Sequence, residues 1–329
     1  MQDIVIIGAG PAGLAAAIAA KEHGLRAVVL EKGALVNSLL HYPAEMVYFT
    51  TPELMEIGGL PFVSPHDKPN RLESLRYYRR VTDAFGLDVV QHERVTGIRR
   101  AGDGLFRVTS HSPAATEPVL RQARAVIIAT GAYDIPNLLD VPGEELPHVS
   151  HYYREPHSHF RRKVVIVGGK NSAAEAALDI YRAGGQPTLV HRGDALGESI
   201  KYWVKPDIEN RIKEGSVKAH FSTRVVEITP TEVVVNGPAG QARLEASFVY
   251  LLTGYRSDTS LLRAAGVEVE PVEGAPFHNP ETYETNVEGL YVIGACVAGK
   301  QSGRIFIENG RFHGQVAVAH LAGRLGVDR

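Results

Sequence analysis

Cysteine is nearly absent from this chain of 329 residues, in which Cys296 is the single one. One cysteine excludes an internal disulfide, a CxxC redox pair and a zinc site built from cysteine ligands. Such low cysteine use, with no basic and apolar leader at the start, is typical of a reducing compartment. We therefore expect a cytoplasmic protein.

An excess of charge and long apolar stretches are absent as well. Lys and Arg number 35 against 37 Asp and Glu, for a net charge of −2. Proteins that bind nucleic acid or anionic membranes normally carry a basic excess, so neither partner is expected. No apolar run approaches the roughly 18 residues that span a bilayer. A chain of this length with 44% hydrophobic residues is expected to fold into two globular domains.

Glycine, in contrast, is abundant at 33 residues, and two loops use it for an identifiable purpose. In the first loop, the apolar run 4–7 leads into Gly8-Ala9-Gly10-Pro11-Ala12-Gly13 and then into the Ala-rich stretch 14–20. This pattern predicts a buried strand, a sharp turn and a helix. Glycine at such a turn lets the backbone approach a pyrophosphate, and the helix N-terminus supplies free amides to it.

A carboxylate follows this first unit at the spacing that a dinucleotide site requires. The next predicted strand, 27–30, ends in Glu31, which is 23 positions after Gly8. A carboxylate there accepts hydrogen bonds from ribose hydroxyls and repels a 2′-phosphate. Strand, glycine loop, helix, strand and acid in this order predict a dinucleotide site; the alternative is an ordinary βαβ turn without a ligand.

The same unit recurs in the second half of the chain. The apolar run 163–167 precedes Gly168-Gly169-Lys170-Asn171-Ser172, a predicted helix over 176–183 and a strand over 187–190. That strand ends in His191-Arg192, and Arg192 is 24 positions after Gly168. A permanently charged guanidinium at this point suits the 2′-phosphate of NADPH. The alternative is a vestigial repeat that binds nothing.

The two units differ in the charge of their final residue, which predicts two different cofactors. The acid-terminated unit suits FAD and the Arg-terminated unit suits NADPH. We therefore predict an α/β fold of two Rossmann-like dinucleotide-binding domains of the three-layer ββα type. The FAD domain is expected to comprise residues 1–133 and 255–329, with an NADPH domain over 134–254 inserted into it.

Several other segments complete this expected organisation. We predict a helix over 71–85, a hairpin of strands 96–100 and 105–110, and a linker over 134–160. Buried strands end in Ala129-Thr130-Gly131 and in Thr253-Gly254, and both turns are expected to mark crossings between domains. A third turn, at Gly294, precedes a predicted helix over 306–325 whose N-terminal amides would face the flavin.

Fourteen histidines raise the possibility of a metal site. His157, His159 and His151 lie close together, but no HExxH or paired carboxylate spacing accompanies them. We interpret them as surface or loop histidines and expect no metal.

The two glycine loops, the Ala129-Thr130-Gly131 turn and the split first domain resemble the low-molecular-weight thioredoxin reductase-like flavoproteins over essentially the whole chain. Within that group the chain is similar to the bacillithiol disulfide reductases. The likeness rests on Glu31-Lys32-Gly33, on Gly168-Gly169-Lys170-Asn171-Ser172-Ala173, on Ser199-Ile200-Lys201 and on 307–314. The thioredoxin reductase CxxC is missing. Bacillithiol reductases often have a cysteine in the first glycine loop, where this chain has Ala12.

The resemblance implies FAD, NADPH and a homodimer. The expected FAD contacts are Gly8, Gly10, Pro11, Ala12, Gly13, Glu31, Lys32, Asn37, Val95, Ala129, Thr130, Gly131, Gly294, Ile305 and Phe306. The expected NADPH contacts are Gly168, Gly169, Lys170, Asn171, Ser172, His191 and Arg192.

The expected reaction is a hydride transfer from NADPH to the flavin and then to an acceptor. From the resemblance, that acceptor is a low-molecular-weight disulfide such as bacillithiol disulfide. A ferredoxin- or flavodoxin-NADP reductase is the alternative enzyme, with a small redox protein as acceptor. A non-catalytic, redox-responsive flavoprotein is the alternative from another class. Cys296 is a candidate nucleophile for the disulfide, although packing as a small apolar residue is the favoured interpretation.

Overall fold

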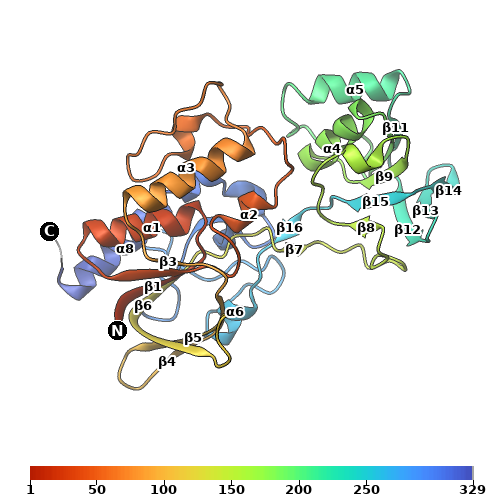
Figure 1. The fold of residues 1–329 in the computed structure, drawn as a ribbon. Helices are drawn as coiled ribbons and strands as arrows, with labels where there is room; N and C mark the ends of the chain where they lie inside the picture. The colour runs from red at the N-terminus through yellow and green to blue at the C-terminus, as the bar shows by residue number, and fades with distance from the viewer. Residues whose placement is uncertain (328–329) are drawn as a thin grey trace. The chain divides into compact units, whose positions relative to one another are not determined.

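The computed structural model describes residues 1–327, which form two compact units (Figure 1). Unit 1 comprises Met1–Leu40, Val47–Ile135 and Tyr255–Arg329, and unit 2 comprises His41–Met46 and Pro136–Gly254. Short strands lie where the chain leaves unit 1 and returns to it, β7 (Ile135–Pro136) and β16 (Tyr255–Arg256). Unit 2 is thus inserted into unit 1, and the short segment His41–Met46 also belongs to it.

Unit 1 is built on a seven-stranded sheet. Its strands are β1 (Gln2–Ile7), β2 (Ala27–Leu30), β3 (Val89–Val90), β4 (Arg94–Arg100), β5 (Phe106–His111), β6 (Val119–Ile128) and β17 (Leu290–Val292). Its helices are α1 (Pro11–Glu22), α2 (Asn37–Leu40), α3 (Arg71–Ala84), α6 (Ser260–Ala264), α7 (Ile307–Gly310) and α8 (His313–Leu325). Short 3₁₀ helices are η1 (Pro52–Met55), η3 (Gly294–Ala298) and η4 (Ser302–Arg304).

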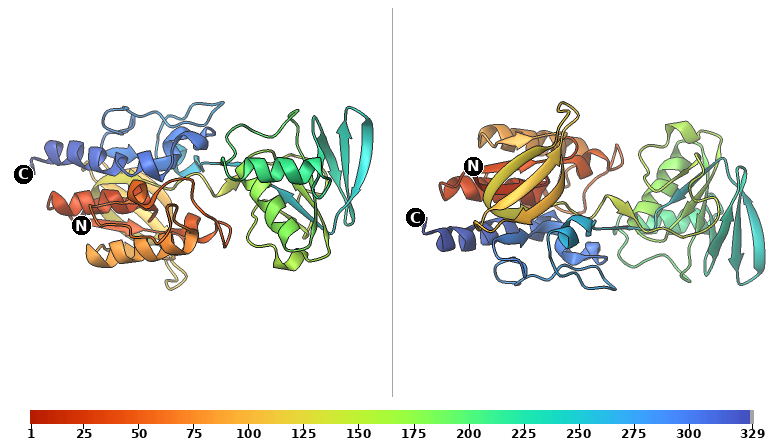
Figure 2. Two further views of the ribbon diagram at one scale, coloured as in Figure 1. Left: turned by 90° about the horizontal axis from the view of Figure 1, so that it is seen from above. Right: turned by 90° about the horizontal axis from the view of Figure 1, so that it is seen from below.

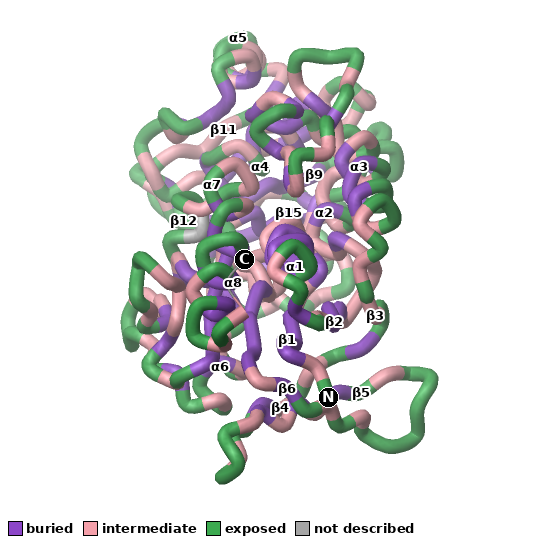
Figure 3. The backbone as a smooth tube through the Cα atoms, turned by 90° about the vertical axis from the view of Figure 1, so that its left-hand side faces the viewer, coloured by how far each residue is buried: buried purple, intermediate pink, exposed green. Residues whose placement is uncertain are grey.

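The strand β6 joins a parallel sheet to an antiparallel one. Its first half pairs antiparallel with β5, and its second half runs parallel between β1 and β17. This arrangement gives unit 1 three layers: helices, a parallel sheet and a β-meander. Helix α1 is almost wholly buried because its alanines face the sheet and α8 (Figure 3).

Unit 2 repeats this design on a smaller scale. A parallel sheet contains β8 (Val149–Ser150), β9 (Lys163–Val167), β10 (Gln186–Val190), β11 (Lys218–His220) and β15 (Phe248–Leu251). A separate antiparallel sheet contains β12 (Arg224–Ile228), β13 (Glu232–Gly237) and β14 (Gly240–Glu245). The helices are α4 (Asn171–Arg182), α5 (Lys205–Lys213) and the 3₁₀ helix η2 (His157–His159).

Alternate residues of β9 explain why this unit has two cores. Val164 and Ile166 pack with the residues of α4, whereas Val165 and Val167 pack with those of β13 and β15. Successive side chains of a strand point to opposite faces, so a wholly apolar strand is buried on both. The predicted α/β architecture, with two parallel-sheet units of the dinucleotide-binding kind, is therefore present.

Several elements lie where local sequence signals predicted them. The predicted helix over 71–85 is α3, which begins with a capping box between Asn70 and Glu73. The predicted hairpin is β4 and β5. Helix α4 begins at Asn171, earlier than the predicted 176, because Ala174 N already donates to Lys170 O at 3.1 Å.

The predicted C-terminal helix over 306–325 is interrupted. It divides into α7 and α8, which are separated at Arg311 and Phe312. A Cβ on Gly314 would lie 2.6 Å from the backbone N of Ala16, so the start of α8 lies directly against α1 (Figure 2).

Two predictions about the 134–160 region are wrong. It is not a free linker, because β8 pairs with β15 and Tyr153 is part of the core of unit 2. His159 is not a surface residue either, since it is buried and its Nε2 lies 2.8 Å from the Tyr250 hydroxyl. His157 is exposed.

Among residues 1–327, no helix combines the length and apolar character needed to cross a bilayer. Within the same residues, no group of three or more His, Cys, Asp or Glu side chains is arranged to hold a metal ion.

Candidate functional site

The first glycine loop contains glycines with two different roles. A Cβ on Gly8, which has φ of 107°, would lie 2.5 Å from the carbonyl oxygen of Ala129, and a Cβ on Gly13 would overlap the carbonyl oxygen of Gly8. Packing alone therefore requires glycine at both positions. Gly10 is the N-cap of α1, and a Cβ there would meet no atom within 4 Å. Gly10 thus borders open space at a helix N-terminus, where a pyrophosphate fits.

Glu31 lies directly beside this loop. It is buried, and its two carboxylate oxygens accept hydrogen bonds of 2.9 Å from the backbone amides of Ala9 and Gly33. Those amides hold the carboxylate in one orientation next to the glycine loop. An ionised carboxylate has about four acceptor positions, so two remain for ribose hydroxyls.

Other predicted contacts gather around the same loop. Val36 N donates to Ala9 O at 3.2 Å, which brings the adjacent Asn37 to the loop. Asn37 Oδ1 in turn accepts from Ala34 N at 3.3 Å. Glu93 N donates to Glu31 O at 2.8 Å. The chain therefore lies beside Glu31 just before β4, the strand that contains Val95.

The opposite side of the loop is formed by the turns that follow β6 and β17. A Cβ on Gly294 would lie 2.9 Å from the Cβ of Ala12, and a Cβ on Gly310 would lie 3.2 Å from Ile305 Cγ2. Phe306 precedes α7 and is exposed. Lys32 forms an ion pair with Asp134. The structure therefore brings together the first glycine loop, Glu31, the 129–131 turn and Gly294.

One buried hydroxyl supports a ligand beside the first glycine loop. Thr130 Oγ1 is buried and has no hydrogen-bond partner within residues 1–327, and Thr130 N would lie 3.3 Å from a Cβ on Gly8. A buried hydroxyl normally has a partner, so Thr130 fits a site where a bound ligand supplies it. The hydroxyls of Thr50 and Ser257 in unit 1 are also buried without a partner among these residues. No local sequence pattern marks either of them.

A stack of aromatic rings supports the Gly294 turn. Gly294 N donates to His313 Nδ1 at 3.2 Å, and the His313 ring stacks on Tyr283 at 4.2 Å between centroids. Tyr283 stacks on His278 on its other side. Burial lowers the pKa of His313 to about 4, with a smaller contribution from His278, so the ring stays neutral and Nδ1 remains an acceptor.

This lowered pKa predicts a pH-dependent loss of stability. Because the folded-state pKa is about 4 and the unfolded value about 6.5, the unfolded chain binds a proton between these pH values and the folded chain does not. The free energy of unfolding is expected to decrease as the pH falls from 6.5 towards 4. Urea titrations at pH 7.5 and 5.5 measure it, with His313→Asn as the comparison. Equal losses in the two proteins would contradict the prediction.

Cys296 is fully buried, with its Sγ 3.0 Å from the carbonyl oxygen of Ile293. Burial raises the pKa of this thiol to about 11. A nucleophilic cysteine needs access and a lowered pKa. Both observations favour the interpretation of Cys296 as a small apolar packing residue.

The second glycine loop, in unit 2, is also close-packed. A Cβ on Gly168 would lie 2.7 Å from Leu252 O, and a Cβ on Gly169 would overlap the His191 ring. His191 therefore packs beneath the loop. Burial lowers its pKa, and the positive charges of Arg192 and Lys170 lower it further.

Two cations flank this loop on the surface of unit 2. Lys170 is the N-cap of α4 and is exposed, and Arg192 is exposed two residues after β10. In the part of the chain that the structure describes, no hydrogen bond or ion pair occupies the Arg192 side chain. Ser172 is exposed in the first turn of α4, whereas the carboxamide of Asn171 is turned towards residues 199–201.

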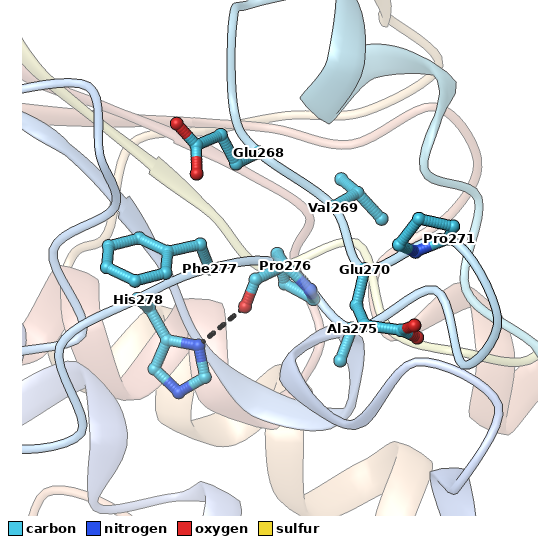
Figure 4. Close-up of a pocket in the computed structure, with 8 residues that line it drawn as sticks. All are labelled: Glu268, Val269, Glu270, Pro271, Ala275, Pro276, Phe277 and His278. Atoms are coloured by element: carbon cyan, nitrogen blue, oxygen red, sulfur yellow. Dashed lines mark hydrogen bonds between the residues drawn. The ribbon is translucent and has the colours of Figure 1, made fainter.

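A pocket of about 480 Å³ lies elsewhere in unit 1, along the segment that precedes β17 (Figure 4). It is lined by Glu268, Val269, Glu270, Pro271, Ala275, Pro276, Phe277 and His278. None of these is a predicted site residue. The pocket is lined by the carboxylates of Glu268 and Glu270 and has no helix N-terminus, whereas both glycine loops lead into one, so the loops remain the candidate sites.

Known proteins are similar to this chain over nearly its whole length. The bacilliredoxin reductase Bdr of Bacillus subtilis (strain 168) is 40% identical over 324 residues, which cover 98% of each chain. The structure of the bacillithiol disulfide reductase Bdr from Bacillus cereus matches with a TM-score of 0.95 and 37% identity, over 98% of this chain and 99% of the other. The predicted resemblance is therefore confirmed.

More distant relatives are also similar over most of the chain. A ferredoxin–NADP reductase of Ignicoccus hospitalis is 26% identical over 89% of this chain and 90% of its own. The thioredoxin reductase of T. acidophilum, at 20% identity, covers 98% of both chains with a TM-score of 0.76 and shares the fold. Residues 5–294 match the family described as pyridine nucleotide-disulphide oxidoreductase. The chain therefore belongs to the pyridine nucleotide-disulphide oxidoreductase family and is an oxidoreductase that uses a flavin and a nicotinamide cofactor.

Proposed function

We propose that the protein is an NADPH-dependent, FAD-containing reductase of a low-molecular-weight disulfide of the bacillithiol type. The full-length likeness to the two Bdr proteins, over 98% of the chain, carries this proposal. The ferredoxin–NADP reductases are less similar and support the alternative acceptor only weakly.

The choice of cofactors follows from the charges at the two glycine loops. Unit 1 is the FAD domain, because the buried Glu31 carboxylate suits ribose hydroxyls. Unit 2 is the NADPH domain, because the exposed Arg192 and Lys170 suit a phosphorylated ribose and the pyrophosphate.

The residues of each domain have defined tasks in this reaction. The amides at the N-terminus of α1 bind the pyrophosphate of FAD, and the hydroxyl of Thr130 donates to a polar atom of the cofactor. The turn at Gly294 is held in place by His313. Bound FAD would supply two-electron redox chemistry, by which NADPH and one proton reduce the disulfide to two thiols with NADP⁺ as the other product.

The acceptor must be reduced without a protein dithiol, since Cys296 is the only cysteine and is buried. Cys296→Ala is therefore expected to turn over the disulfide within twofold of the wild-type kcat. A matched measurement is alkylation of the native protein at pH 8, where the thiol is expected to react much more slowly than in urea. A loss of disulfide turnover with intact flavin reduction would show that Cys296 is the nucleophile.

The test of the function is anaerobic mixing with NADPH followed by a panel of acceptors. We expect NADPH to bleach the flavin absorbance. The acceptor panel comprises several disulfides, oxidised bacilliredoxin, ferredoxin, flavodoxin and oxygen. We expect NADPH to be consumed fastest when bacillithiol disulfide is the acceptor. Faster turnover with ferredoxin or flavodoxin would favour the alternative enzyme. A flavin that NADPH does not bleach would contradict both.

A further inference from the structure

The segment of residues 197–201, here called the 197–201 segment, lies against the second glycine loop. Gly197 N donates to Gly169 O at 2.8 Å. A Cβ on Gly197 would lie 3.2 Å from that oxygen and 3.4 Å from Lys170 Cγ. The segment therefore contacts the loop closely at the end where α4 begins.

Asn171 joins the 197–201 segment to α4 through both ends of its carboxamide. Its Nδ2 donates to Ser199 O at 2.9 Å, and its Oδ1 accepts from Lys201 N at 2.8 Å. Rotating the carboxamide to face a phosphate would break both hydrogen bonds. The geometry thus suits a side chain that holds backbone rather than one that binds the cofactor.

A second connection fixes the far end of the segment. Lys201 is only 5% exposed, and its ammonium group forms an ion pair with Glu175, one turn further along α4. A buried ammonium needs such a partner, because burying an unpaired charge is costly. The Lys201 Nζ also lies 5.8 Å from the centre of the Trp203 ring. The segment is therefore attached to α4 at two successive turns.

We propose that Asn171 is a positioning residue that fixes the 197–201 segment as a wall of the nicotinamide nucleotide site. This inference rests on the proposed function, in which unit 2 binds NADPH. With the wall in place, the first-turn amides of α4 and the exposed Lys170 and Ser172 remain directed to the nucleotide. Without the hydrogen bonds of Asn171, the 197–201 segment is disordered in the nucleotide-free protein. It must then become ordered when the nucleotide binds, and this entropic cost weakens binding.

The test compares Asn171→Ala with Asn210→Ala, a matched change of an exposed asparagine on α5 of the same unit. We expect Asn171→Ala to speed amide hydrogen exchange at Lys201 in the nucleotide-free protein. The KM for NADPH and the Kd for NADP⁺ should rise about tenfold, as two lost hydrogen bonds suggest, with kcat changed less than twofold. Asn210→Ala should change none of these.

Two further variants separate positioning from direct binding. Ser172→Ala removes an exposed hydroxyl and should weaken nucleotide binding without changing exchange at Lys201. Asn171→Asp keeps an acceptor for the Lys201 amide, so this amide should retain most of its protection against hydrogen exchange. This variant therefore tests the role of Asn171 even if Asn171→Ala folds poorly.

The outcomes are distinguishable from failure of the proposed function. If NADPH fails to reduce the wild-type flavin, the proposed function fails. If it does reduce the flavin, two results would overturn the role of Asn171. One is weaker nucleotide binding in Asn171→Ala with unchanged exchange at Lys201, which would make Asn171 a direct ligand. The other is faster exchange with unchanged KM and Kd, which would place the 197–201 segment outside the site.

Discussion

Replacing Gly10 with aspartate is expected to yield a folded protein that has lost its flavin, with affinity for FAD at least 100-fold weaker. Gly10 has φ of −75° and ψ of 175°, a conformation open to any residue, and a Cβ there meets no atom within 4 Å. Aspartate is also a favoured N-cap, so α1 itself should not be destabilised. Its carboxylate, however, would face the pyrophosphate, and two like charges about 4 Å apart repel by roughly 4 kcal/mol near a protein surface.

The measurements are the flavin absorbance that remains after desalting and the thermal stability of the flavin-free protein. Gly10→Asn is the matched control, since it has the same size without the charge and should lose much less affinity. Gly13→Ala should behave in the opposite way and destabilise even the flavin-free protein, because its Cβ would overlap the Gly8 carbonyl. Equal flavin loss in the aspartate and asparagine variants would argue against a phosphate at this loop.

Removal of the Arg192 side chain is expected to lower kcat/KM for NADPH about 100-fold and that for NADH less than threefold. A charged hydrogen-bonded pair of guanidinium and phosphate contributes about 1.5–3 kcal/mol, and NADH has no 2′-phosphate to pair with. Because Arg192 is exposed, its substitution by alanine leaves no buried charge behind. Steady-state rates with both nucleotides measure the effect.

Arg182→Ala is the control for a general loss of positive charge. Arg182 is the last residue of α4, at the end away from the glycine loop, and is paired with Asp207. Arg182→Ala should change kcat/KM only slightly, and by the same factor for NADPH and for NADH. Equal losses with NADPH and NADH in Arg192→Ala would refute the 2′-phosphate assignment.

The sequence alone was enough to locate both glycine-loop units. In each, an apolar strand, a glycine turn and an Ala-rich helix follow one another, and a charged residue ends the next strand. These are local patterns, because strand burial, helix propensity and turn geometry depend on neighbouring residues. The predicted helix over 71–85 corresponds to α3, whose capping box is also a local feature.

Contacts between distant residues decided how individual side chains are used. The carboxamide of Asn171 is hydrogen-bonded to the backbone of Ser199 and Lys201, and Thr50 is buried without any sequence signal. His159 is buried, and its Nε2 lies 2.8 Å from the hydroxyl of Tyr250, a residue 91 positions away in the sequence. No pattern of neighbouring residues carries this information.

The single cysteine illustrates what the sequence determines and what only the tertiary structure determines. Its number excluded an internal dithiol from the sequence alone, because a disulfide needs two sulfur atoms. The tertiary structure adds that this thiol lies against the Ile128 and Ile293 carbonyls and that its burial raises its pKa, which favours a packing role over a nucleophilic one. Likewise, the sequence located the glycines of the first loop. Only the packing of Ala129 on Gly8 and the open space at Gly10 distinguish the glycine that the fold requires from the glycine that a ligand requires.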